Sequence, residues 1–262
     1  MSVRLGAVGY LNARPLTWAL DRAAGRWDIR YDVPSACADR LRAGEVDLGL
    51  VPSIEYVQAE DYRLVPGVGI GSDGPVDSVA LYARGPLDRI RRLTLDTSSR
   101  TSVALIRILC RERFHVNPEF VAHGPDLSGA TGEDDAALLI GDPAFDLDHE
   151  AAGFRKIDLG AEWLALTGLP FIYAAWTGRP GAASVADVQD LERARDAGLR
   201  ARDAIAAEYG GNDPSRVARA AAYLRDNVRY EFGAREAAGL QAFLDFAWEL
   251  GLVPRRRTLE FY

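Results

Sequence analysis

Hydroxyl side chains are concentrated at positions 97–102, between an alternating, strand-like segment and an apolar run with helical spacing. Five of these six residues carry a hydroxyl group: Thr97, Ser98, Ser99, Thr101 and Ser102. A helix N-terminus has unpaired N–H groups and a partial positive charge, so hydroxyl donors there suit a carboxylate or a phosphate. Because no glycine-rich phosphate loop accompanies them, the pattern favours a small carboxylate. The ordinary alternative is one helix cap among solvated turn residues.

Four further polar residues stand at the ends of expected strands: Asn12, Ser53, Ser78 and Asp142. Ligands of open α/β sheets bind at the carboxyl ends of strands, so Asn12, Ser53 and Asp142, which follow strands, are candidates for ligand contact. Ser78 is a further candidate at the start of a strand, close to a loop. Each also has an ordinary interpretation. Asn12 and Ser53 are suited to capping helices, Ser78 to a polar strand edge, and Asp142 to a turn ahead of Pro143.

The sequence contains few residues that suit metal binding or nucleophilic catalysis. The histidines stand alone, without a second ligand at metal-binding spacing: His115, His123 and His149. There is no nucleophile elbow and no dinucleotide fingerprint. We therefore expect no metal and no cofactor, and an enzyme built this way would act through positioning and electrostatics.

Strands alternate with helices along the first two thirds of the chain, which predicts α/β architecture with parallel strands. The last third is alanine-rich and charged at helical spacing, with helices expected near 187–208, 214–227 and 234–251. A helix is also expected from Asn12 to about residue 24. At 262 residues the chain is long enough for two small domains, each with its own core.

The composition restricts the partners of the protein. With 31 basic and 38 acidic residues the net charge is −7, which argues against a nucleic acid or an anionic membrane as the main partner. No apolar stretch is long enough to span a membrane, and the N-terminal segment does not have the pattern of a secretory signal. We expect a cytoplasmic protein in which Cys37 and Cys110 are buried free thiols.

Six motifs, taken in order, resemble those of the MqnA family, the chorismate dehydratases of the futalosine route to menaquinone. They are GYLNARPL at 9–16, SIEY at 53–56, GP at 74–75 with SV at 78–79, TSSRTS at 97–102, LIGDPA at 139–144 and TGLPF at 167–171. The ordered series runs from residue 3 to about residue 178, and the helical last third matches in kind. The series as a whole is more specific than any single motif.

The resemblance implies a fold like the type II periplasmic binding proteins, with two α/β lobes and a ligand cleft between them. Residues 1–84 with 178–262 would form lobe one, and residues 85–177 would form lobe two. The expected crossings lie near 84–86 and 176–178. Hydroxyl groups from both lobes would then face one another across the cleft. A homodimer is one expectation for the assembly.

The reaction that the resemblance implies is loss of water from chorismate to give 3-[(1-carboxyvinyl)oxy]benzoate, a cofactor-independent lyase reaction. In this interpretation Asn12 and Ser78 are catalytic, and they hold a carboxylate or the departing hydroxyl group. The substrate-binding residues are Ser53, Ser98, Arg100, Thr101, Ser102 and Asp142. Arg100 is a possible charge partner whose ordinary state is surface solvation. The substrate's own side-chain carboxylate is allowed as the base, with Asn12 orienting it.

Two alternatives remain open from the sequence. One is an enzyme like the 1,4-dihydroxy-6-naphthoate synthase of the same pathway, which shares the two-lobed fold and would be expected to use a cleft histidine. The other is a non-catalytic cytoplasmic protein that binds a small acid. The absence of a matching histidine motif counts against the first, and the lack of a secretory signal counts against a transport receptor.

Overall fold

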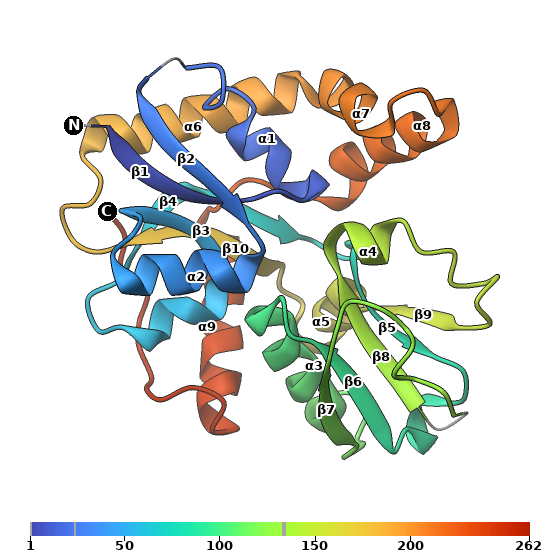
Figure 1. Cartoon of the computed structure of the whole chain (residues 1–262). Helices are drawn as coiled ribbons and strands as arrows, with labels where there is room; N and C mark the ends of the chain where they lie inside the picture. The colour runs from blue at the N-terminus through green and yellow to red at the C-terminus, as the bar shows by residue number, and fades with distance from the viewer. Residues whose placement is uncertain (1, 24, 133–134) are drawn as a thin grey trace.

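The computed structural model describes residues 2–23, 25–132 and 135–262 of the chain. Within this part the named strands form two five-stranded sheets. Figure 1 shows them as two lobes, with the first sheet in the upper part of the view and the second at the lower right. The two-lobed α/β arrangement confirms the fold class predicted from the sequence.

The first sheet is mixed and has the order β2-β1-β3-β10-β4. β1 runs parallel to β2 and β3, whereas β10 runs antiparallel to β3 and β4. Every residue of β3 and β10 is buried, because these inner strands are covered on both faces. The strands are β1 (Val3–Val8), β2 (Trp27–Asp32), β3 (Leu48–Pro52), β4 (Arg63–Ser72) and β10 (Phe171–Gly178).

Helices cover both faces of the first sheet. α1 and α6 lie above it in Figure 1, and α2 and α9 lie below it. The last helical segments of the chain therefore return to the lobe that begins it. The helices of this group are α1 (Arg14–Thr17), α2 (Pro34–Ala43), α6 (Val185–Arg200), α7 (Arg202–Gly210), α8 (Pro214–Ala222) and α9 (Ala234–Glu249), with a π-helical turn at Tyr223–Asn227.

The second sheet is also mixed and has the order β7-β6-β8-β5-β9. β6 runs parallel to β7 and β8, and β5 runs antiparallel to β8 and β9. Its elements are β5 (Val79–Ala83), β6 (Arg92–Asp96), α3 (Arg100–Glu112), β7 (Glu119–His123), β8 (Asp135–Ile140), α4 (Gly141–Phe145), β9 (Arg155–Asp158) and α5 (Leu159–Thr167).

The chain crosses between the sheets earlier than the sequence suggested. The crossings are residues 73–78, before β5, and residues 168–170, before β10. The expected boundaries at 84/85 and 177/178 placed each of these strands in the opposite lobe. Gly85 and Gly178 lie at or beyond the ends of these strands, whereas the loops with Gly74 and Gly168 make the crossings.

The segment after β1 differs from the expected helix. It forms a 3-10 turn at Leu11–Ala13 and the short helix α1, and the expected end at residue 24 lies outside the described residues. Asn12 lies inside the 3-10 turn, so the expectation that it caps a helix is wrong. Ser53 likewise begins a 3-10 helix, Ser53–Gln58, whose capping position is Pro52.

Both cysteines are buried free thiols, as the sequence predicts. Cys37 lies in α2 and donates to the carbonyl oxygen of Ala7 in β1, and Cys110 lies in α3. Burial raises the pKa of each thiol to about 12. The thiols are therefore protonated at neutral pH and act as small apolar groups in the core.

The close packing of α6 against α1 depends on Gly198 in α6. A Cβ atom at this position would lie 1.8 Å from the carbonyl oxygen of Pro15. We expect Gly198→Ala to lower the free energy of unfolding by about 1–3 kcal/mol through overpacking. Alanine favours a helix by about 1 kcal/mol over glycine, so a gain in stability in urea unfolding would contradict this close contact.

Candidate functional site

A small pocket lies where the two lobes meet. The strands β1, β3 and β8 end at its wall, and the start of α3 faces it from the second lobe. All of its lining residues are uncharged. They are Val8, Tyr10, Asn12, Pro34, Pro52, Ile70, Val79, Ser99, Ser102, Ile140, Gly141, Tyr173 and Ala174.

Two hydroxyl groups of the 97–102 stretch line the pocket. Ser99 caps α3, and its side-chain oxygen accepts from the N–H group of Ser102 at 3.3 Å. Ser99 also donates to the side-chain oxygen of Ser102 at 3.0 Å, which leaves the Ser102 hydroxyl hydrogen for another acceptor. The start of α3 therefore presents a hydroxyl donor beside the positive end of a 13-residue helix.

The neighbouring hydroxyl groups join the two lobes outside the pocket. The hydroxyl oxygen of Thr101 accepts from the N–H group of Ile54 at 3.2 Å, and it lies 3.4 Å from that of Ser53. Ser53 donates to the carbonyl oxygen of Ile172 at 2.7 Å. The carbonyl oxygen of Ser98 accepts from the N–H group of Ser35. These contacts hold the start of α3 against the first lobe.

Arg100 also lies outside the pocket. Its guanidinium group contacts Asp39 at 2.8 Å and Glu55 at 3.0 Å, both in the first lobe. The Glu55 carboxylate is almost fully buried and also pairs with Arg42 at 2.9 Å. The structure thus places Arg100 in an ion-pair network between the lobes.

Asn12 lines the pocket, next to a contact between the two lobes. Its side-chain amide makes no hydrogen bond with the described residues, so it is available to a ligand. The next residue towards the N-terminus, Leu11, donates its N–H to Asp142 in the second lobe at 2.9 Å. Asp142 is half-buried. Desolvation raises the pKa of its carboxyl group, and the hydrogen bond from Leu11 opposes this shift.

Tyr10 packs directly against Gly141 of the second lobe. A Cβ atom at residue 141 would lie 2.6 Å from the tyrosine ring, and the glycine has a φ of +64°. Both properties require glycine here. The Tyr10 ring therefore covers the pocket at the point where the lobes touch.

Ser78 is buried and precedes the lining residue Val79, but it does not itself line the pocket. Its carbonyl oxygen accepts from the N–H group of Gly141 at 2.8 Å. Its hydroxyl group lies 2.6 Å from that of Tyr223, which comes from the π-helical turn. The structure thus places Ser78 beside the pocket, with its side chain hydrogen-bonded to the last third of the chain.

The titratable groups that line the pocket are tyrosines. Burial raises the pKa of Tyr10, and the Ser98 hydroxyl opposes this shift. Burial also raises the pKa of Tyr173 well above its usual value, and its hydroxyl lies 3.2 Å from that of Ser72. At neutral pH both side chains are neutral hydrogen-bond donors.

The pocket is closed in this structure. Its volume is about 40 Å³, which is enough for one or a few water molecules. A ligand with a six-membered ring requires the lobes to move apart at the two crossings.

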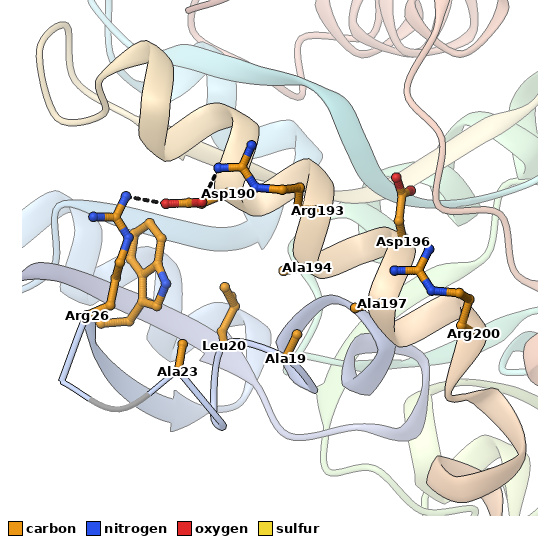
Figure 2. A pocket seen from close by; sticks show the side chains of 11 residues that line it. Ala19, Leu20, Ala23, Arg26, Asp190, Arg193, Ala194, Asp196, Ala197 and Arg200 are labelled. Atoms are coloured by element: carbon orange, nitrogen blue, oxygen red, sulfur yellow. Dashed lines mark hydrogen bonds and ion pairs between the residues drawn. The ribbon is translucent and has the colours of Figure 1, made fainter.

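A larger hollow of about 440 Å³ lies on the outside of the first lobe, between α6 and the segment after α1. Figure 2 shows Asp190 of this hollow paired with both Arg26 and Arg193. Arg26 contacts Asp187 and Asp190, and Arg193 contacts Asp190. Two of the three arginines that line this hollow, Arg26 and Arg193, are thus paired with carboxylates.

The structure also adds residues that the sequence reasoning missed. Tyr10, Ser99, Gly141 and Tyr173 line the pocket, and Tyr223 contacts Ser78. Tyr10, Ser99 and Gly141 belong to motifs that the sequence already singled out. Tyr173 and Tyr223 lie in an apolar strand and in a helical segment, where they look like ordinary core residues.

The histidines lie outside the pocket. The ring of His149 is 3.0 Å from the carbonyl oxygen of Phe154, and His115 and His123 also contact backbone carbonyl groups. Within the described residues no group of three or more metal-binding side chains is close enough to hold an ion. No helix in the described part of the chain is long and apolar enough to cross a membrane.

Comparison with solved structures shows which fold the chain has. The chain is similar to protein AF1704 of Archaeoglobus fulgidus, with a TM-score of 0.74 and 18% identity over 96% of this chain and 98% of that one. It is also similar to the alkanesulfonate-binding protein SsuA of Xanthomonas axonopodis pv. citri bound to MOPS, with a TM-score of 0.71 and 18% identity over 98% and 96%. The fold is that of the periplasmic binding proteins.

Sequence comparison narrows this class to one family. Residues 3–249 match the family model described as menaquinone biosynthesis, so the chain belongs to that family. It is also 32% identical to the chorismate dehydratase of Thermus thermophilus, over 92% of this chain and 93% of that protein. The resemblance found in the sequence motifs is therefore confirmed.

The ion pairs of Arg100 give a test of its place in the structure. We expect Arg100→Met to lower the free energy of unfolding by about 1–2 kcal/mol, because Glu55 is buried and keeps only Arg42 as a partner. Arg107→Met, on the same helix, removes a guanidinium group that lies over Phe120, and serves as the control. Urea unfolding at low and high salt measures the difference, which salt should reduce. Equal stability of Arg100→Met and the wild type would contradict the interlobe ion pair.

Proposed function

We propose that the protein is a chorismate dehydratase that removes water from chorismate to give 3-[(1-carboxyvinyl)oxy]benzoate. The observation that carries this proposal is the interlobe pocket, in a chain of the menaquinone biosynthesis family, whose walls hold neutral hydrogen-bond donors. The 32% identical relative from Thermus thermophilus carries the same activity in its name. The reaction is a carbon–oxygen lyase reaction.

The chemistry of chorismate suits a site of this kind. The proton that is lost lies on the ring carbon that carries the enolpyruvyl ether, and this carbon is conjugated through a ring double bond to the ring carboxylate. Negative charge spreads onto that carboxylate, hydroxide then leaves, and the ring becomes aromatic. Preplaced donors around the carboxylate stabilise the developing charge where water is excluded. No step of this sequence requires a cofactor.

We assign one substrate carboxylate to the start of α3. Ser102 has a hydroxyl hydrogen to donate, and Ser99 fixes its orientation. The start of α3 is held in place by side-chain contacts between the lobes, which involve Thr101, Ser53 and Arg100. Ser98 holds the same turn through its backbone contact with Ser35, and Asp142 fixes the Tyr10–Asn12 turn through Leu11.

Asn12 is assigned to the reacting end of the substrate. Both tyrosines that line the pocket have raised pKa values and are poor bases at neutral pH. The substrate's own enolpyruvyl carboxylate is then the group that accepts the proton. The unbonded amide of Asn12 orients this carboxylate, and Ser78 donates to the second carboxylate or to the departing hydroxyl group.

Turnover of chorismate tests the proposed function directly. We expect purified protein, treated with EDTA and without added nucleotide, to convert chorismate into an aromatic acid that has lost one water molecule. Absorbance and mass spectrometry follow the product. Binding of chorismate by calorimetry without turnover would indicate an acid-binding protein, and would contradict the proposed reaction.

The Asn12 side chain gives a second test. We expect Asn12→Ala to abolish turnover while affinity for chorismate stays within about tenfold, because the amide orients the base and contributes little to binding. Asn212→Ala changes an exposed asparagine outside the pocket and serves as the control. Steady-state kinetics and calorimetry measure the two effects. Full activity in Asn12→Ala would remove Asn12 from the mechanism.

A further inference from the structure

The π-helical turn Tyr223–Asn227 lies against the first crossing between the lobes. The Asn227 side chain donates to the carbonyl oxygen of Pro75 at 3.1 Å. In the preceding helix, Arg219 lies 3.7 Å from Asp77. Together with the 2.6 Å contact between Tyr223 and Ser78, three side chains of this region hold residues 75–78.

The Tyr223 ring is fixed by packing that does not involve its hydroxyl group. It lies against Phe145 of the second lobe, with the ring centroids 4.8 Å apart, and it is 3% exposed. Ser78 is 1% exposed. The hydroxyl pair is therefore buried, and its geometry is set by the surrounding apolar contacts.

The direction of this hydrogen bond decides what Ser78 can do. A phenol is a better donor than an aliphatic alcohol, and burial keeps Tyr223 protonated by raising its pKa. When Tyr223 donates, the Ser78 oxygen is the acceptor and its own hydrogen is left to point elsewhere. The pocket, lined by the adjacent Val79 and by Gly141, is the neighbouring space.

We propose that Tyr223 is a positioning residue for the dehydration, and that it holds Ser78 as a donor to the substrate. This inference rests on the proposed function, because it assigns Ser78 to the second carboxylate or the departing hydroxyl group of chorismate. Tyr223 itself does not touch the substrate. Its effect on turnover passes through Ser78.

Three variants and a control test this role: Tyr223→Phe, Ser78→Ala, the double variant, and Tyr230→Phe. Tyr223→Phe removes the hydroxyl group and keeps the ring against Phe145. Tyr230 is also buried, and its hydroxyl makes no hydrogen bond with the described residues. Tyr230→Phe is therefore a matched control for the loss of a buried phenolic hydroxyl.

We expect Tyr223→Phe to lower kcat for chorismate about five- to tenfold, with KM within about threefold. In the Ser78→Ala background the same change should alter kcat by less than about twofold, because Tyr223 acts only through Ser78. Tyr230→Phe should stay within about twofold of the wild type. A purely structural role would give equal losses in both backgrounds.

Two results would overturn the inference in an active enzyme. One is a Tyr223→Phe variant with the kcat of the wild type, and the other is an additive loss in the double variant. Absence of chorismate turnover by the wild type, measured in the same assay, overturns the proposed function and this inference with it. The failure of the function and the failure of the positioning role are thus distinguishable.

Discussion

The arrangement of the site depends on how the start of α3 is seated against the first lobe. Backbone groups of Ser35 and Ile54 donate to Ser98 and Thr101 across the boundary, so the helix N-terminus is held by hydrogen bonds as well as by apolar packing. On the other side of the pocket, Leu11 donates to Asp142 and the Tyr10 ring packs against Gly141. These contacts place polar groups of both lobes around one small pocket.

The protein has a net negative charge, and no positively charged side chain lines the pocket. An acidic ligand would therefore bind there without a cationic partner in the lining. In the mechanism that we propose, hydroxyl groups, an amide and the dipole of α3 supply the stabilisation instead. Arg100, the cation nearest to the hydroxyl stretch in sequence, is occupied by Asp39 and Glu55. In the proposed dehydration neutral donors are sufficient, because the substrate would supply both the electron sink and the base.

The C-terminal third of the chain packs on the first sheet and also contacts the first crossing between the lobes. Its helices pack against α1, β4 and β10, and the π-helical turn reaches the crossing that carries Ser78. Contacts from the last third of the chain therefore fix the position of Ser78 between the two lobes.

The sequence alone determined the alternation of strands and helices, the buried cysteines and the family, because these follow from local periodicity and from short ordered motifs. It did not determine which lobe β5 and β10 join, since strand pairing depends on partners distant in the chain. It also did not separate Ser99 and Ser102, which face the pocket, from Ser98, Arg100 and Thr101, which join the lobes. Tyr223 and Ser78 are 145 residues apart, so only the tertiary structure decided that they meet.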